Sequence, residues 1–209
     1  MIADKFSLDK YILKKKFPSK VIISSESGEF LFQAVKPFVK NILSIFDSQS
    51  SNVPALDISW KIKSGLMAIG YNYVITDRSH APLAYLEGEK QPISWINFII
   101  KDIFKQEIGR VQSESISDRL THIDIVVRNK KIASFYSAAS TFRLSRVSGP
   151  YIMDFSGDKQ KMLDRRIGVS IGVILAGYNL ALVKSSGSID WDKPVATGDD
   201  IYKIKQRRV

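Results

Sequence analysis

The stretch YIMDFSGDKQKMLDRRIGVSIGVILAGYNLALV, from Tyr151 to Val183, decides the fold of this chain. It opens on YIMDF, which alternates as a β-strand does, and SGD then reads as a turn. From Lys159 the pattern is helical, with Asp158 as the expected N-cap. The second half, Ile167 to Val183, carries no charge. A helix that is apolar on every face must be buried, in lipid or in protein.

A membrane span is the first of the two ways to bury this helix. As a helix, Ile167 to Val183 would be about 25 Å long, which is short for a bilayer whose hydrocarbon core is roughly 30 Å thick. The segment also contains Ser170, Asn179 and three glycines, and helix glycines let neighbouring elements approach closely. These features favour burial in protein. A span remains the alternative, with Arg165 and Arg166 on its cytoplasmic flank.

The preceding two thirds of the chain predict what surrounds the helix. Short alternating runs are broken by turn residues. Three segments share the order strand, polar turn, strand: VIISSESGEFLF from Val21, YVITDRSHAPLAYL from Tyr73 and IDIVVRNKKIASFY from Ile123. Such recurring hairpins indicate an up-and-down antiparallel sheet. The predicted fold class is therefore mainly β: a closed antiparallel barrel of about twelve strands, wide enough to hold a helix, around a buried hydrophobic C-terminal helix.

The segment from Gln91 to Val111 fits either a strand or a short helix. We predict a strand, a loop around Lys101 to Lys105, and a second strand at EIGRV, residues 107–111.

Composition limits the classes of partner. The 209 residues carry a formal net charge of +10 and include no cysteine. The positive excess favours anionic partners (phospholipid headgroups, nucleic acid or acidic proteins), with a merely solvated basic surface as an equal alternative. The lack of cysteine excludes disulfides and thiolate zinc sites. MIADKFSLDK at the start has no signal-peptide character, so we expect a cytoplasmic protein with the option of peripheral membrane association.

No pattern in the sequence indicates an enzyme, a cofactor or a metal site. His80 and His122 lack metal-ligand spacing, and structural or surface roles are favoured for both. Asp154, Asp158 and Asp164 lack the ligand spacing of a calcium site, so we expect strand, cap and helix-start roles for them. Gly-rich phosphate loops and Gly-x-Ser-x-Gly motifs are also missing from the sequence.

Clusters of basic residues are the candidate sites for a lipid or another anion. They are Lys14, Lys16, Lys20, Arg143, Arg146, Lys159, Lys161, Arg165 and Arg166. Lys14 and Lys16 share one strand face, expected to be the outer one, and the last four crowd the predicted helix entrance. Near an anionic membrane each basic residue contributes about 1 kcal/mol. Two alternatives stay open: Arg165 and Arg166 form ion pairs at the barrel mouth, or the strand lysines only block edge aggregation.

The order of several pieces resembles the tubby-like superfamily, which includes tubby proteins, LURP-one-related proteins and phospholipid scramblases. YILKKKF with the following hairpin, and YNYVITDRSHAPLAYLEGE, resemble strands of LURP-one-related proteins. EIGRV resembles a scramblase element, and YIMDFSGD with DRRIGVSIGVILA resembles the family's last strand and final apolar helix. The resemblance covers about Tyr11 to Val183 and implies a tubby-like barrel of about twelve strands around the C-terminal helix.

The sequence also departs from that superfamily. Lys184 to Val209 continues past the helix, whereas in tubby and LURP-one-related proteins the helix lies at or near the chain end. The cysteine-rich segment of animal scramblases is absent, and the basic phosphoinositide pocket of tubby domains has no residue-by-residue match. We divide the chain into an N-terminal arm (1–10), a barrel domain (11–185) with a central helix at about 159–183, and a C-terminal tail (186–209).

The expected function is non-enzymatic binding of anionic phospholipid or phosphoinositide headgroups at a membrane surface. One alternative is a protein-interaction or signalling scaffold of LURP-one-related type, with a protein partner bound through the C-terminal tail. A second is phospholipid scrambling, which requires the apolar helix to insert in the membrane. Nucleic-acid binding is not favoured, because the sequence has no RNP-type aromatic motif and no zinc finger.

Overall fold

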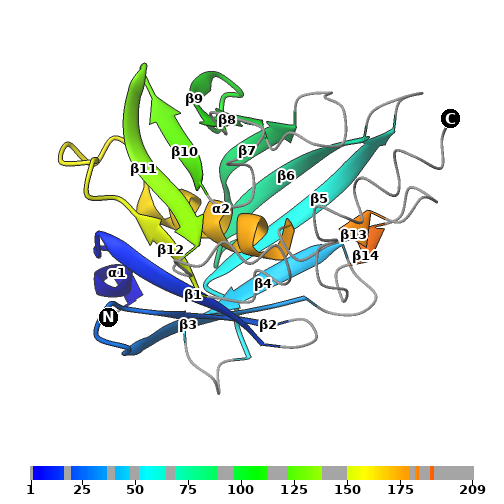
Figure 1. Cartoon of the computed structure of the whole chain (residues 1–209). Coiled ribbons are helices and arrows are strands. Elements are labelled where there is room, and N and C mark those ends of the chain that lie inside the picture. The colour runs from blue at the N-terminus through cyan, green and yellow to red at the C-terminus, as the bar shows by residue number, and fades with distance from the viewer. Residues whose placement is uncertain are drawn as a thin grey trace, which may run out of the picture.

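A computed structural model gives the architecture of the chain (Figure 1). It describes residues 2–16, 20–36, 41–47, 52–64, 69–88, 97–112, 122–137, 150–178, 182–183 and 189–190. Twelve strands form one closed barrel, in which each strand pairs antiparallel with the next and β1 pairs with β12 to close the ring. The predicted closed antiparallel barrel of about twelve strands is confirmed.

The barrel strands follow one another as an up-and-down meander. They are β1 (Lys10–Lys16), β2 (Lys20–Ser24), β3 (Phe30–Val35), β4 (Ile42–Phe46), β5 (Leu56–Ser64), β6 (Ile69–Asp77), β7 (Pro82–Gly88), β8 (Phe98–Lys101), β9 (Glu107–Gln112), β10 (His122–Val127), β11 (Lys130–Ser137) and β12 (Tyr151–Asp154). The other elements are the helices α1 (Ile2–Lys5) and α2 (Arg165–Tyr178) and a separate strand pair, β13 (Leu182–Val183) with β14 (Ile189–Asp190).

The predicted hairpins correspond to strand pairs in the barrel. The three similar segments are β2 with β3, β6 with β7, and β10 with β11. The strand, loop and strand predicted toward Val111 are β8, the turn 102–106 and β9, while residues 91–96 lie outside the described residues.

Helix α2 lies inside the barrel, where the strands surround it (Figure 1). It contacts β1, β2, β5 and β12, and residues 167–176 are all buried. Inward-facing strand residues such as Leu13, Ile23 and Ile58 are buried with it in one hydrophobic core. The all-round apolar pattern is therefore explained by burial in protein. None of the helices in the described part of the chain has both the length and the apolar character that a membrane span requires.

Two helix glycines show how closely α2 fits. A Cβ atom on Gly168 would lie 2.2 Å from the ring of Phe155, a fully buried residue. A Cβ atom on Gly172 would lie 3.4 Å from Leu13, an ordinary van der Waals contact. The close approach of Phe155 therefore requires glycine at position 168, whereas position 172 has room for a methyl group.

The helix begins later than the sequence pattern predicts. α2 starts at Arg165 rather than Lys159, and its described part ends at Tyr178 rather than Val183. Residues 159–164 are not helical, because Asp158 Oδ1 accepts a hydrogen bond from Met162 N at 2.7 Å and Lys161 takes a φ of 51°. The prediction that Asp158 caps α2 was therefore wrong.

Asp164 is the residue that caps the helix. Its Oδ1 accepts a hydrogen bond from Arg166 N at 2.9 Å, and its carbonyl accepts from Ile167 N at 3.0 Å, which is the N-cap arrangement. The helix-start role predicted for Asp164 is confirmed, and so is the strand role of Asp154, the last residue of β12.

Candidate functional site

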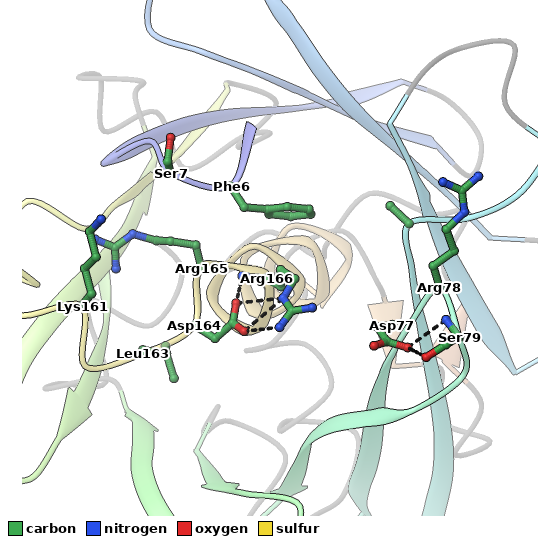
Figure 2. Close-up of a pocket in the computed structure, with 11 residues that line it drawn as sticks. Phe6, Ser7, Asp77, Arg78, Ser79, Lys161, Leu163, Asp164, Arg165 and Arg166 are labelled. Carbon is green, nitrogen blue, oxygen red and sulfur yellow. Dashed lines mark hydrogen bonds and ion pairs between the residues drawn. The ribbon is translucent and has the colours of Figure 1, made fainter. Parts of the chain in front are cut away.

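A cavity of about 730 Å³ opens at the end of the barrel where residues 155–164 lead into α2. We name this end the entrance rim. Figure 2 shows the cavity lined by four parts of the chain: the connection from α1 to β1, the residue before β5, the β6–β7 turn, and the start of α2. The lining residues are Phe6, Ser7, Ala55, Asp77, Arg78, Ser79, Lys161, Leu163, Asp164, Arg165 and Arg166. The volume is in the range of known small-molecule pockets.

The N-terminal arm forms one wall of this cavity. Phe6 is buried and stacks on Phe32 of β3, with ring centroids 4.4 Å apart. Lys5 Nζ donates a hydrogen bond to the carbonyl of Asp47 at 2.7 Å, just beyond the end of β4. These contacts attach α1 and Phe6 to the entrance rim.

Arg165 is held by an internal ion pair beside the cavity. Its Nη1 donates to Asp158 Oδ2 at 2.6 Å and its Nη2 to Asp9 Oδ1 at 3.3 Å. The side chain of Asp158 is 0% exposed, and the guanidinium stacks on Phe155 at 4.5 Å from the ring centroid. A buried charge of this kind is stable only when it is paired. Arg165 therefore fastens the helix start to the N-terminal arm.

Arg166 is also paired, in this case with the helix cap. Its Nε and Nη2 donate to the two carboxylate oxygens of Asp164, at 3.1 Å to Oδ1 and 2.6 Å to Oδ2, and this pairing raises the pKa of Arg166. The ion-pair alternative that the sequence left open for Arg165 and Arg166 is therefore the arrangement found.

Asp77 lies across the cavity from Arg166 (Figure 2). The hydrogen bond from Ser79 lowers the pKa of Asp77, with smaller contributions from backbone N–H groups and the charge of Arg166. The Asp77 carboxylate accepts hydrogen bonds within its own turn, from Ser79 and from the N–H of Ala81.

Three turns at the entrance rim share one backbone design. They span Ser25 to Glu29, Asp77 to Ala81 and Asp102 to Gln106. In each, the fourth residue donates its N–H to the carbonyl of the first, at 2.9–3.0 Å, and takes a positive φ of 63° to 86°. This is the three-residue hairpin loop in which a type I turn is followed by one residue in the left-handed conformation. Glycine supplies that conformation only in the first turn; His80 and Lys105 supply it in the others.

The first side chain of each turn completes the design. Ser25 Oγ, Asp77 Oδ1 and Asp102 Oδ1 accept a hydrogen bond from the N–H of the fifth residue at 3.1, 3.0 and 2.8 Å. The second and third residues are exposed. Their side chains make none of these backbone bonds, but the hydroxyls of Ser27 and Ser79 hydrogen-bond the first side chain of their turns, at 2.8 and 2.6 Å. These tip residues are Glu26-Ser27, Arg78-Ser79 and Ile103-Phe104.

Six exposed cations at the entrance rim form no ion pair among the described residues. They lie in the β6–β7, β8–β9 and β10–β11 turns, at the start of β11 and in segment 159–161, and we name them the basic sector: Arg78, Lys105, Arg128, Lys130, Lys159 and Lys161. Lys105 also lies over the ring of Tyr85, 5.8 Å from its centroid. The other side of the rim, over β2 to β4, carries exposed Asp4, Glu26 and Glu29. The exposed cations that lack an ion pair among the described residues therefore lie on one side of the rim.

The predicted anion-binding residues do not form one surface. Lys159 and Lys161 are exposed at the entrance rim. The opposite end of β1 and β2 carries Lys14, Lys16 and Lys20. There Lys16 is directly opposite Lys20, and this pair lies about 20 Å along the strands from the rim. Lys14 and Lys16 are exposed, as the outer-face prediction requires. Arg143 and Arg146 lie outside the described residues.

Sequence reasoning missed four members of the basic sector: Arg78, Lys105, Arg128 and Lys130. A usable signal was present, because every second turn of an up-and-down barrel lies at the same end. Arg78 and Arg128 lie in hairpin turns that the sequence predicts, and counting strands would have brought those turns together with segment 159–161.

No group of three or more potential metal ligands occurs in the part of the chain that the structure describes. His80 is exposed, with Nδ1 3.9 Å from Asp57 Oδ2, and His122 is the first residue of β10.

Comparison with known proteins supports the fold. A solved structure of a protein from Arabidopsis thaliana, AT5G01750, matches with a TM-score of 0.51 and 13% sequence identity over 81% of this chain and 90% of that one. The likeness agrees with the predicted barrel fold and does not show membership of the tubby-like superfamily. At this identity the likeness concerns the fold alone. No protein-family model and no curated protein matches the chain.

Proposed function

We propose that the protein binds anionic phospholipid headgroups at a membrane surface through the basic sector of the entrance rim, without enzymatic chemistry. The observation that carries the proposal is the set of six exposed cations, from Arg78 to Lys161, that have no ion pair among the described residues. Each basic residue near an anionic leaflet contributes about 1 kcal/mol. Six such basic residues acting together are sufficient to hold a peripheral protein at the membrane surface.

The cavity at the same rim suits a single headgroup. Arg78 and Lys161 lie on different sides of the start of α2 (Figure 2), so a phosphate in the cavity would have a cation on either side. Arg165 and Arg166 already have carboxylate partners. In this proposal they shape the cavity, and Arg78 and Lys161 supply its available charge.

The resemblance to tubby-like proteins adds support at the level of the fold. Tubby domains bind phosphoinositides. The Arabidopsis neighbour is similar to this chain in its overall fold. The chemistry shared by phosphoinositides and anionic phospholipids is the phosphate group, and vesicles of different composition separate the two.

Vesicle co-sedimentation tests the proposal. We expect binding to phosphatidylcholine vesicles that contain phosphatidylserine, little binding to phosphatidylcholine alone, and loss of binding near 1 M salt, where charge interactions are screened beyond about 3 Å. A third vesicle with a few per cent phosphoinositide would show whether one headgroup is preferred. Equal recovery with neutral and anionic vesicles would contradict the proposal.

A matched pair of charge reversals locates the surface. Arg78→Glu with Lys161→Glu should weaken binding to anionic vesicles by more than tenfold, because reversing two charges lowers the net charge of the rim by four units. Lys14→Glu with Lys16→Glu makes the same change in net charge toward the far end of β1 and should have a much smaller effect.

The two other functions predicted from the sequence have less support. The protein-interaction scaffold depends on the tail 186–209, which lies outside the described residues except for β14. Removal of residues 184–209 followed by a pull-down at high salt tests it. Scrambling requires α2, about 21 Å long over its described residues, to leave the barrel and cross roughly 30 Å of hydrocarbon.

A further inference from the structure

Two large apolar side chains project from the entrance rim at the tip of the β8–β9 turn. Phe104 is 76% exposed and Ile103 is 52% exposed. We name them the tip pair. A single exposed apolar residue is ordinary, but an adjacent isoleucine and phenylalanine at the end of a turn leave a continuous apolar surface in water.

The turn does not need these side chains for its own structure. Asp102 Oδ1 accepts hydrogen bonds from Phe104 N at 2.9 Å and Gln106 N at 2.8 Å, and the carbonyl of Asp102 accepts from Lys105 N at 3.0 Å. All of these bonds use the backbone or the Asp102 carboxylate. The turn is thus built without the tip pair and presents it in a fixed orientation, so little order is lost when the pair is buried.

The matching turns carry polar residues at the same two positions. They are Arg78-Ser79 in the β6–β7 turn and Glu26-Ser27 in the β2–β3 turn. The backbone design therefore accepts polar tips, and neither folding nor turn geometry accounts for an apolar pair at 103 and 104. This points to a partner with apolar character.

The neighbours of the tip pair are basic. In the barrel order, the β8–β9 turn lies between the β6–β7 turn, which carries Arg78, and the β10–β11 turn, which carries Arg128. Adjacent hairpin turns are separated by two strand spacings, about 10 Å. Lys105 directly follows the tip pair in the chain. An apolar projection between cations is complementary to an anionic bilayer surface, which is negative outside and apolar beneath.

We infer that Ile103 and Phe104 insert into the interfacial layer of an anionic bilayer, while the cations on either side contact its headgroups. The inference rests on the proposed function and adds a depth and an orientation to it. The barrel meets the membrane with its entrance rim, tilted toward the β6 to β11 side, and α2 remains inside the barrel.

The fluorescence of a single label tests the insertion. The chain has no cysteine, so Phe104→Cys carries one environment-sensitive nitrobenzoxadiazole label at a known site. With phosphatidylserine-containing vesicles we expect a blue shift and at least a twofold increase in emission. The matched control is Gln112→Cys, which is exposed at the opposite end of β9 and whose label should not respond.

A second variant measures the effect of the tip pair on affinity. Ile103→Ser with Phe104→Ser keeps the turn residues Asp102 and Lys105, so the thermal unfolding midpoint should be unchanged, while partitioning onto the same vesicles falls by tenfold or more. If the native chain binds anionic vesicles but the label at position 104 stays unchanged, or the double variant binds equally well, the insertion is wrong and the proposed function stands. If the native chain binds no anionic vesicles, both fail.

Discussion

The barrel interior around α2 and the turns of the entrance rim depend on their side chains in different ways. In the interior, packing fixes the identity of each residue: Gly168 is required because the ring of Phe155 occupies the space of a Cβ atom. At the rim, the first and fourth residues of a turn fix the backbone, and the tip residues range from Glu26 to Arg78 to Phe104. Substitutions in the interior should therefore change stability, whereas substitutions at the tips should change binding.

The largest loss of stability is expected where the two regions meet, at the buried pair of Asp158 and Arg165. Asp158→Ala removes the 2.6 Å ion pair and the hydrogen bond to Met162 N, and it leaves Arg165 buried with only the exposed Asp9. Removing one partner of a buried pair costs about 3–5 kcal/mol. Chemical denaturation of the variant measures the cost.

Asp164→Ala, an exposed N-cap, is the control, with an expected loss of about 1 kcal/mol. Equal losses would show that burial of the pair has no special weight.

Gly168→Ala tests the interior directly. The added methyl group would overlap the ring of Phe155, and overpacking of this kind costs about 1–3 kcal/mol. Gly172→Ala places the same group in ordinary contact and should be neutral or stabilising by up to about 1 kcal/mol, because alanine favours the helix. Calorimetry of both variants distinguishes them, and a similar loss for each would contradict the packing described for α2.

Asp102→Ala separates the framework of a rim turn from its tip. The substitution removes the acceptor of the hydrogen bonds from Phe104 N and Gln106 N, and we expect a loss of about 1 kcal/mol in the free energy of unfolding. Vesicle binding should also weaken, because the tip pair is no longer held in place. Asp77→Ala, in the matching turn, should cost a similar amount and leave the tip pair unaffected. Unchanged vesicle binding by Asp102→Ala would show that the fixed orientation of the tip pair is unimportant.

Ser170→Ala examines a polar group in the interior. The Ser170 hydroxyl is fully buried in α2 and has no hydrogen-bond partner within the described part of the chain. Replacing an unsatisfied polar group with an apolar one should be neutral or stabilising by up to about 1 kcal/mol. Urea denaturation checks this, and a clear destabilisation would indicate a partner for the hydroxyl.

The smallest effect on stability is expected when the pH is lowered. The hydrogen bond from Ser79 lowers the pKa of Asp77 below its usual value of 3.8, so the unfolded chain takes up this proton more readily than the folded protein. The stabilisation is present above about pH 4 and is lost as the pH falls through the lower folded value. The difference in stability between the native chain and Asp77→Asn should therefore narrow below pH 4. A constant difference down to pH 2 would contradict the shift.

The fold could be predicted because its main signals are local. Period-two alternation marks most of the barrel strands, and the all-round apolar run from Ile167 marks the enclosed helix. The start of the helix could not be predicted, because the partners of Asp158 are not evident from the sequence. Arg165 donates to both Asp158 and Asp9, and Asp9 is 156 positions away from Arg165. The helical spacing after Lys159 was therefore misleading.

The candidate site was only partly predictable. Lys159 and Lys161 stand out in the sequence as a basic pair beside the helix, and both are exposed at the rim. The exposure of Phe104 could not be foreseen, because an aromatic residue between strands predicts burial as readily as projection. The contacts predicted for Lys14, Lys16 and Lys20 stay a prediction, and they concern the other end of the barrel.

Hydrogen–deuterium exchange of the full chain, with and without phosphatidylserine-containing vesicles, tests the central claim most directly. We expect slower exchange on binding in the turns 78–81 and 102–106 and in segment 159–164, with no change in the exchange of residues 167–176 of α2. Faster exchange in α2, or protection confined to the Lys14, Lys16 and Lys20 end of the barrel, would contradict it.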